Sequence, residues 1–379
     1  MKIGILTFHN TLNYGAALQT YATQAALNKL GVENEIIDYT NEFRRQLYSE
    51  KKLILRSLKN RQILGAVRTL AGTPFIKRRK KNFDKFYRER VAVSKEKYFS
   101  ADQLKATPPK YDYYMVGSDQ VWNYDHNGQD MSYLLDFVSD KAKTISYASS
   151  FGLDSISENV KDDYIRLLGS IQYLSVREKM GSKIIQSLTG RIPSVVLDPV
   201  FLLNKNQWQN ITDDNIGKSE PYILLYTTKA KHYRDFLRIT KYDSYGIRVV
   251  HIGTSMRLCD MFKRNTNISF ASSPEKFLGL IKNAKLVLTS SFHGTAFSIL
   301  FKKQFVSFRG NNLGKDARIV ELLGDLGISD RLFHDKMTAD QVNKQICYES
   351  VQEKLERLRE ESMRFLHQAL TSGIEDKRE

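Results

Sequence analysis

The segment best suited to chemistry lies late in the chain, where small hydroxyl residues, one histidine and one glycine stand together. Residues 288–294 read LTSSFHG and separate two apolar runs, an order that predicts a strand, a tight turn and a helix. Ligands of open α/β sheets bind at the carboxyl ends of strands, and the N–H groups that begin a helix favour an anion. We therefore expect His293 to act as a general base or a phosphate ligand, with Ser290, Ser291 and Gly294 binding the same substrate. The alternative is a histidine that only packs between domains.

Two charged residues in the first half of the chain also follow predicted strands. Asp119 lies in a Gly-Ser-Asp turn after the apolar stretch 111–116, and Arg177 follows the short stretch 174–176. A carboxylate in such a place can serve as the acid or base that faces an acceptor, and an arginine can hold a phosphate or carboxylate. The competing interpretations are a helix N-cap for Asp119 and a salt bridge to Glu178 for Arg177.

The first turn of the chain supplies candidates for the acceptor side of a cleft. A predicted strand over residues 2–8 leads into the polar turn 9–15, which contains Asn10, Asn13 and Gly15. These residues could equally serve only the turn itself. Trp122 could stack on a sugar ring, although a tryptophan beside a strand is also typical of a core. The turn has no G-x-G-x-x-G motif, which disfavours a dinucleotide.

Strands and helices alternate along the chain, which predicts two Rossmann-like α/β domains that face a cleft, a GT-B-like architecture. We expect an N-terminal, acceptor-side domain over residues 1–205 and a C-terminal, donor-side domain over residues 216–335. A basic helical insertion at about 41–100 is expected to interrupt the first sheet. Residues 339–379 are expected to form a C-terminal helix that could pack back on the N-terminal domain.

Composition favours an enzyme without a metal in a reducing compartment. The seven His show no H-x-x-x-H spacing, and the two Cys lie far apart. We therefore expect no metal site, no disulfide framework and a cytoplasmic location. The opening residues 1–8 are too short for a signal peptide, and no apolar run approaches the roughly 20 residues of a spanning helix.

The net charge of +16 is concentrated in one segment. Residues 44–97 contain 18 Lys or Arg and 4 Asp or Glu. Such a segment can be a solvated face, or it can bind an anionic membrane surface, in this case as a peripheral protein of the inner membrane face. No nucleic-acid-binding motif accompanies the charge, so we expect no nucleic acid partner.

Five motifs in this order resemble the polysaccharide pyruvyl transferase family. The resemblance implies a GT-B-like fold, phosphoenolpyruvate as co-substrate with no other cofactor, and a pyruvate ketal placed on a sugar of a capsular or exopolysaccharide precursor. That saccharide acceptor is commonly lipid-linked. The motifs are ILTFHN…NYGAALQ at 5–19, GSDQVWN at 117–123, SVRE at 175–178, LDP at 197–199 and SSFHG at 290–294.

The family has an arginine in the region of Arg177 and a His-Gly turn that matches His293 and Gly294. Many members carry Arg-x-His at the second site, whereas this chain has Ser291 two residues before the histidine. The resemblance therefore implies that the donor phosphate loses one guanidinium there. The cations that could replace it are Lys229, Arg309, Lys315 and Arg318.

Three functions follow from these observations. The first is transfer of pyruvate from phosphoenolpyruvate. The second is a glycosyltransferase with the same cleft and a nucleotide sugar, which an uncharged residue at 291 would suit. The third is a non-catalytic protein that binds a membrane or nucleic acid through the basic segment.

Overall fold

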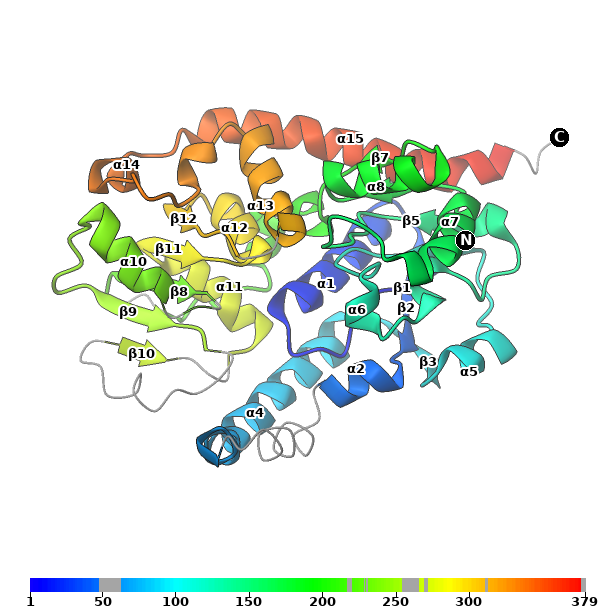
Figure 1. The fold of residues 1–379 in the computed structure, drawn as a ribbon, viewed down its shortest axis with the longest axis horizontal. Helices are drawn as coiled ribbons and strands as arrows, with labels where there is room; N and C mark the ends of the chain where they lie inside the picture. The colour runs from blue at the N-terminus through cyan, green and yellow to red at the C-terminus, as the bar shows by residue number, and fades with distance from the viewer. Residues whose placement is uncertain are drawn as a thin grey trace.

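The computed structural model describes residues 1–47, 63–216, 220–227, 229, 231–253, 266–268, 272–310 and 313–375. Within these residues the chain forms two α/β halves, with one long helix running along both of them (Figure 1).

The N-terminal half contains a parallel five-stranded sheet in the order β3-β2-β1-β4-β5. Helix α1 (Tyr14–Lys29) connects the first two strands, and its side chains are buried along most of its length because it lies between the two halves. The carboxyl end of β1 therefore opens toward the second half. The strands are β1 (Lys2–Leu6), β2 (Glu33–Tyr39), β3 (Val93–Tyr98), β4 (Tyr113–Val116) and β5 (Thr144–Ser146).

The C-terminal half repeats this order, as β10-β9-β8-β11-β12, again with parallel pairing. Two Rossmann-like sheets in one chain confirm the predicted GT-B-like fold class. The strands are β8 (Tyr222–Tyr226), β9 (Arg248–His251), β10 (Thr266–Ile268), β11 (Leu286–Thr289) and β12 (Phe305–Ser307). The helices between and after them are α10 (Lys231–Thr240), α11 (Pro274–Asn283), α12 (Phe292–Leu300) and α13 (Leu313–Asp325).

Further helices and strands complete the two halves and bridge them. They are α5 (Ala101–Ala106), α6 (Tyr124–Asn127), α7 (Glu158–Ser170), β6 (Ser175–Val176), α8 (Lys179–Thr189), β7 (Ser194–Val195), the 3-10 turn η3 (Pro199–Leu202), α9 (Lys205–Gln209), α14 (Ala339–Asn343) and α15 (Tyr348–Glu375).

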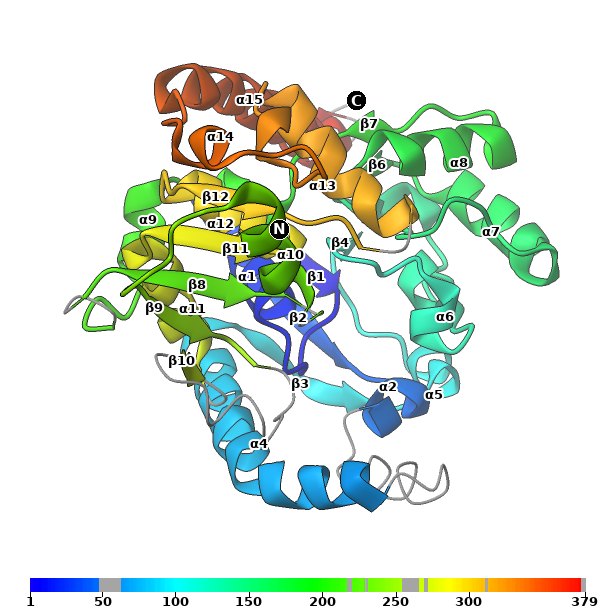
Figure 2. The ribbon, with the colours of Figure 1, turned by 60° about the vertical axis from the view of Figure 1, so that its left-hand side comes forward.

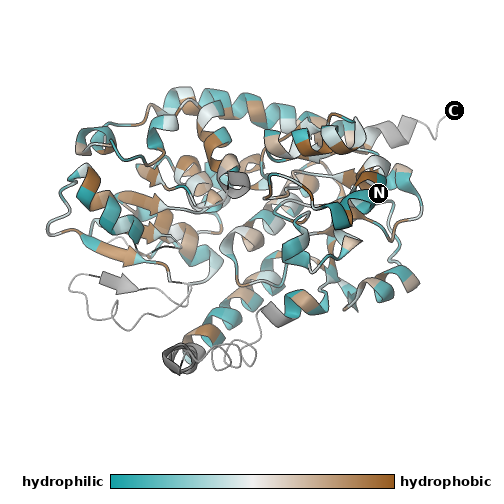
Figure 3. Cartoon of the chain, in the orientation of Figure 1, coloured by the Kyte–Doolittle hydropathy of each residue, from teal (hydrophilic) through white to brown (hydrophobic). Residues whose placement is uncertain are grey.

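The last helix, α15, crosses from the C-terminal half to the N-terminal half (Figures 1 and 2). Arg359 Nε donates to the carbonyl of Phe201 at 2.6 Å, and the Ser362 hydroxyl accepts from the Leu197 N–H at 2.9 Å. Polar and apolar residues alternate along the helix, as Figure 3 shows. The apolar face is buried through residues such as Leu355, so the helix braces the two halves.

Aromatic side chains fill the contact between the halves. Tyr14, in the first turn of α1, stacks on Phe277 of α11 with 4.6 Å between ring centroids. Its hydroxyl donates to the Ser272 carbonyl at 3.2 Å. Trp208 packs edge to face on Phe297, with 4.9 Å between centroids. The buried contacts of Tyr14 fix the start of α1 against the C-terminal half.

The predicted helical insertion at 41–100 is partly wrong. Its end, β3, is an edge strand that pairs with β2 and extends the sheet. Helices α2 (Glu42–Leu47) and α4 (Ile63–Arg90) are present as expected. Residues 48–62 of the basic segment lie outside the described part of the chain.

Candidate active site

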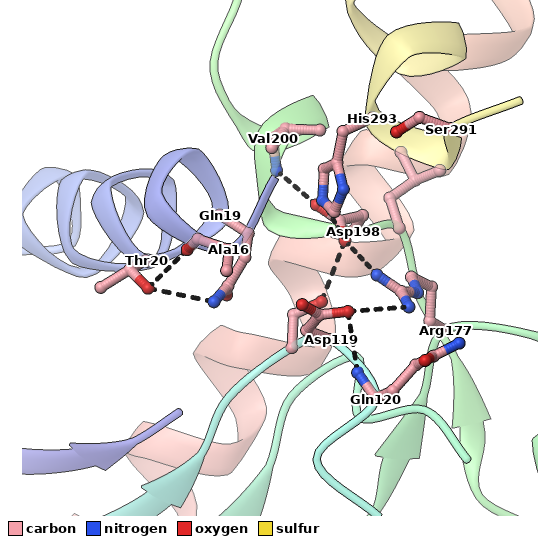
Figure 4. Close-up of polar contacts among 12 residues, drawn as sticks. Ala16, Gln19, Thr20, Asp119, Gln120, Arg177, Asp198, Val200, Ser291 and His293 are labelled. Carbon is pink, nitrogen blue, oxygen red and sulfur yellow. Dashed lines mark hydrogen bonds and ion pairs between the residues drawn. The ribbon is translucent and has the colours of Figure 1, made fainter. Parts of the chain in front are cut away.

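Five ionisable side chains from both halves meet at the carboxyl ends of the strands, and we call them the charged cluster. Asp119 and Asp198 lie three residues after β4 and β7, Arg177 and Glu178 directly follow β6, and His293 lies in the first turn of α12. Figure 4 shows His293 and Arg177 converging on Asp198 from different elements, with Asp119 beside the guanidinium. The separate strand ends predicted from the sequence thus form one site.

Asp198 is the centre of the charged cluster. Its Oδ2 accepts from Arg177 Nη1 at 2.7 Å and from the Ser118 hydroxyl at 3.0 Å, and it lies 3.5 Å from His293 Nε2. Its Oδ1 accepts from the Val200 N–H at 3.1 Å. Burial alone would raise the pKa of Asp198, but the charges of His293 and Arg177 outweigh it and hold the pKa well below its usual range. Asp198 is therefore a buried anion that orients both Arg177 and His293.

Arg177 has unused hydrogen-bonding capacity. Its side chain is 2% exposed, and its Nε and Nη2 lie 3.7 Å from Glu178 and 3.8 Å from Asp119. Neither nitrogen has a hydrogen-bond partner among the described residues. Burial works against the charge, but the neighbouring carboxylates raise the pKa of the guanidinium, which stays charged. An anion that enters the cluster would find two N–H donors here.

Arg318 of α13 brings a second guanidinium to the same place. The guanidinium carbons of Arg177 and Arg318 lie 4.8 Å and 5.9 Å from the ring centroid of Phe292. The buried Nε of Arg318 also has no hydrogen-bond partner among the described residues. Burial and the charge of Arg177 lower the pKa of Arg318 to about 10, which leaves it protonated at neutral pH.

The other cations that could compensate for Ser291 lie in different places from Arg318. Arg309 is exposed beyond the end of β12. Lys229 is partly buried before α10, and the side chain of Lys315 lies outside the described residues. Arg318 is the candidate that the structure places against the charged cluster.

The two outer carboxyl groups of the cluster have pKa values that shift in opposite directions. Burial would raise the pKa of Asp119, but Arg177, His293 and Arg318 outweigh burial and lower it. Burial raises the pKa of Glu178 in spite of the same two arginines. Its Oε1 accepts from the Ser150 hydroxyl at 2.8 Å. Such a difference lets one carboxyl group act as base and the other as acid.

The conformation of Asp119 sets it apart from an ordinary cap. Its backbone φ is +80°, and its Oδ1 accepts from the N–H of the next residue, Gln120, at 2.9 Å. The next helix, α6, is capped by Asn123 instead. A non-glycine residue in the left-handed region is strained, a state that persists where the surrounding structure holds it in place.

The segment around His293 has the predicted strand, turn and helix. Ser291 caps α12, because its hydroxyl accepts from the Gly294 N–H at 3.3 Å. This bond occupies the N–H of Gly294, so the backbone donors that stay available at this end belong to Phe292 and His293. Ser290 follows the strand directly and is partly exposed.

The acceptor-side candidates fall into different environments. Asn13 caps α1 by accepting from the Ala16 N–H at 3.2 Å, and Gly15 packs against His293. Asn10 has φ of +56° and donates to Asp38 at 3.2 Å. The turn 9–15 therefore connects the charged cluster to the end of β2.

The suggested sugar-stacking role of Trp122 is wrong. Its side chain is 0% exposed, its Nε1 donates to the Tyr133 carbonyl at 2.9 Å, and its ring packs on Phe151 with 5.2 Å between centroids. The indole therefore has no free face for a ligand and belongs to the core.

The sequence indicates no chemical role for Asp198 and only a salt-bridge partner of Arg177 in Glu178, and the structure places both in the cluster. The signal for Asp198 was available, because it follows a short predicted strand as Asp119 does. The proline that follows it, Pro199, is also typical of a plain strand end, and this hides the chemical role. For Glu178 the sequence gives only its adjacency to Arg177.

The described residues were also compared with the requirements of a metal site and of a membrane-spanning helix. Within them, no three His, Cys, Asp or Glu side chains are grouped in a way that could hold a metal ion. In the same part of the chain, no helix combines the length and apolar character needed to cross a membrane.

Comparison with known proteins gives one family and one fold. The family model described as Polysaccharide pyruvyl transferase matches residues 13–312. A search of curated proteins with this sequence gives no match. Among solved structures, UDP-GlcNAc 2-epimerase of Methanocaldococcus jannaschii aligns with a TM-score of 0.50 at 15% identity, covering 94% of this chain and 93% of the epimerase. MnaA of S. aureus, solved with UDP, aligns with a TM-score of 0.50 at 13% identity, covering 96% and 90%. At these identities the likeness concerns the fold alone.

Proposed function

Because the chain belongs to the polysaccharide pyruvyl transferase family, we propose that it transfers pyruvate from phosphoenolpyruvate to a saccharide and closes it there as a ketal. The acceptor is a sugar of a cell-surface polysaccharide precursor. The observation that carries the donor assignment is the pair of guanidinium groups around Phe292, both with buried N–H groups that have no hydrogen-bond partner among the described residues.

The charge of the donor matches this pair. Phosphoenolpyruvate carries about three negative charges on one phosphate and one carboxylate. Arg177 and Arg318 can each bind one of these groups, and the N-terminus of α12 adds backbone donors and a favourable dipole. Arg318 thus takes the place of the arginine that the family commonly has at position 291.

The reaction needs a proton at carbon and removal of two hydroxyl protons. In the proposed sequence Glu178 protonates the methylene carbon of the enol, and one sugar hydroxyl attacks the resulting cationic carbon. The bond to the phosphate oxygen then breaks, and a second hydroxyl closes the ketal. One hydroxyl proton restores Glu178, and the other leaves with inorganic phosphate.

Asp119 and His293 are the bases for those two protons. Asp119 is suited by its lowered pKa, which keeps it ionised, and His293 by its place 3.5 Å from Asp198, which orients the imidazole ring. Asp198 itself is held by four partners and serves to position His293 and Arg177.

A lipid-linked acceptor at the inner membrane face is the second part of the proposal. Its support is helix α4, where seven cations are exposed among the described side chains while Phe83 and Phe86 pack into the core. Near an anionic lipid surface each such cation contributes on the order of 1 kcal/mol. The exposed cations are Lys77, Arg78, Lys80, Lys81, Lys85, Arg88 and Arg90.

Thermal unfolding with candidate donors tests the proposed function. Phosphoenolpyruvate is expected to raise the unfolding temperature saturably, and Arg318→Gln is expected to abolish that rise, because a ligand stabilises only the state that binds it. Arg309→Gln is the matched control, since Arg309 is exposed. A rise with a nucleotide sugar and none with phosphoenolpyruvate would instead support the glycosyltransferase.

A further inference from the structure

A second hollow of the N-terminal half lies outside the charged cluster, and we call it the insertion cavity. Its volume is about 690 Å³, within the range of small-molecule sites. The turn after β1, the ends of β2 and β3, and helices α2 and α4 form its walls. Figures 1 and 2 both place α2, β3 and α4 on the same side of the molecule.

The cavity wall is positively charged. Arg44, Arg45, Lys80 and Lys97 line it, against two acids, Asp38 and Asp84. A compact ligand between these side chains would meet several cations at once, which favours an anion.

Asp38 adds little negative charge to the cavity because three side chains already bind it. His9 Nε2 lies 3.1 Å from its Oδ1, Asn10 donates to the same oxygen at 3.2 Å, and Lys97 lies 3.7 Å from Oδ2. Burial would raise the pKa of Asp38, but His9 and Lys97 outweigh burial and lower it. Arg45 and Lys80 are exposed cations that line the cavity from two different helices, α2 and α4.

Aromatic residues and a buried hydroxyl complete the lining. Phe99 is 44% exposed, and the Arg45 guanidinium lies 5.0 Å from its ring centroid. The hydroxyl of Thr11 is buried without a hydrogen-bond partner among the described residues. Apolar faces with a few placed polar groups suit a ligand that has both rings and hydroxyls.

The insertion cavity also lies close to the reaction centre. Leu12 lines the cavity, and Gly15 packs on His293. Three residues of backbone span at most about 11 Å, so the cavity wall lies within that distance of Gly15. Helix α4 fixes this turn, because Arg79 donates to the Leu12 carbonyl at 2.8 Å and to the Gly253 carbonyl at 3.4 Å.

From this geometry we infer that the insertion cavity binds a phosphorylated saccharide, with the phosphate between Arg45 and Lys80 and the sugar directed along the turn 10–13 toward His293. The identification of this ligand as the acceptor rests on the proposed pyruvyl transfer. The proposal that Arg45 and Lys80 bind a phosphate does not depend on that function.

Calorimetric titration with N-acetylglucosamine 1-phosphate and with N-acetylglucosamine tests the inference, both with and without saturating phosphoenolpyruvate. We expect the phosphorylated sugar to bind at least about tenfold more tightly, which is about 1.4 kcal/mol. The double variant Arg45→Ser, Lys80→Ser should lose this preference. The control Lys183→Ser, Arg357→Ser removes the same two charges from exposed positions on α8 and α15 and should keep it.

Several results would overturn the inference. They are equal affinity for the two sugars, unchanged binding by the double variant, and displacement of the sugar phosphate by phosphoenolpyruvate, which would place it in the donor site. Displacement by phosphatidylglycerol vesicles would instead identify a lipid headgroup site. The two proposals can also fail separately. If phosphoenolpyruvate does not bind but the sugar phosphate still binds through Arg45 and Lys80, the proposed function is refuted and the cavity assignment stands.

Discussion

Gly15 of the N-terminal half packs directly on the imidazole of His293 from the C-terminal half. A Cβ added at Gly15 would lie 2.1 Å from Nδ1 and 2.6 Å from Cε1 of that ring. The ring is 8% exposed and faces Asp198 on its other side, so it has little room to retreat. The absence of a side chain at position 15 therefore sets how closely α1 and α12 approach.

Replacing Gly15 by alanine is expected to displace His293 and to lower transfer activity by about 100-fold, because misplacement of a catalytic group by about 1 Å has effects of that size. Steady-state transfer rates and the unfolding temperature should be measured together. Gly169→Ala is the control, because a Cβ there meets nothing within 4 Å. Full activity of Gly15→Ala would show that the position of His293 is not critical.

Glu178→Gln tests the proposed acid. The amide can still accept from the Ser150 hydroxyl but cannot release a proton, so activity is expected to fall by about 10² to 10⁴. Because burial raises the pKa of Glu178, the acid form persists to higher pH than in an ordinary glutamate. The wild-type rate should then decline as pH rises through that pKa.

The pH profile of the variant distinguishes catalysis from structure. If Glu178 is the acid, the small residual activity of Glu178→Gln should not show that decline. An unchanged profile shape, or a variant as active as the wild type, would assign the proton to another group. The unfolding temperature of the variant confirms that it is folded.

The sequence predicted that there are two sheets, and it predicted most of the charged cluster. The assignment of β3 to a helical insertion was wrong, for a physical reason. Strand β3 reads VSKEKY and was assigned to a helical insertion. An edge strand with only one neighbour needs few apolar residues, so the usual hydrophobic pattern is weak there. Charge and spacing on either side of it favoured a helix.

The cluster was predicted only in part because its members meet through long-range topology. His293 lies 116 residues after Arg177 in the chain, and Arg318, which lies against the cluster, follows Arg177 by 141 residues. No local pattern links these positions. Trp122 was ambiguous for a related reason, since only the surrounding elements decide whether an indole beside a strand faces solvent or core. What the sequence does contain is polar residues at strand ends, and parallel sheets bring those ends together.

Asp198→Asn tests the electrostatic role of the cluster centre. Removing one partner of a buried ion pair costs roughly 3–5 kcal/mol, so we expect a loss of that order in the free energy of unfolding at pH 7. The pKa of Asp198 is lower in the folded protein than the ordinary aspartate value of about 3.9. Its stabilisation is therefore fully present above that value and is lost as pH falls through the folded pKa.

Denaturant unfolding at several pH values checks the direction in which the stabilisation by Asp198 changes with pH. The difference between wild type and Asp198→Asn should be greatest near neutral pH and should shrink below about pH 4. Asp163→Asn is the control, because Asp163 is 51% exposed in a surface pair with Arg166 and should change stability by about 0.5 kcal/mol or less. A constant difference at all pH values would show that the aspartate charge is not what stabilises the fold.

Vesicle binding tests whether α4 docks on a membrane. The protein should bind vesicles that contain phosphatidylglycerol and not neutral phosphatidylcholine vesicles, and binding should weaken as salt rises, because screening shortens the reach of exposed charges. Lys77→Ser, Lys81→Ser and Lys85→Ser together remove three exposed cations of this helix. At about 1 kcal/mol each, their loss should weaken binding by about 100-fold.

Replacing exposed lysines elsewhere is the control for vesicle binding through α4. Lys29, Lys183 and Lys302 are exposed and lie outside α4, so a triple serine variant at these positions lowers the net charge equally. If docking belongs to α4, only the first variant should lose vesicle binding, while both should bind phosphoenolpyruvate as the wild type does. Equal losses in the two variants would mean that overall charge, and not this helix, attracts the protein to the surface. Binding to neutral vesicles at every salt concentration would contradict electrostatic docking altogether.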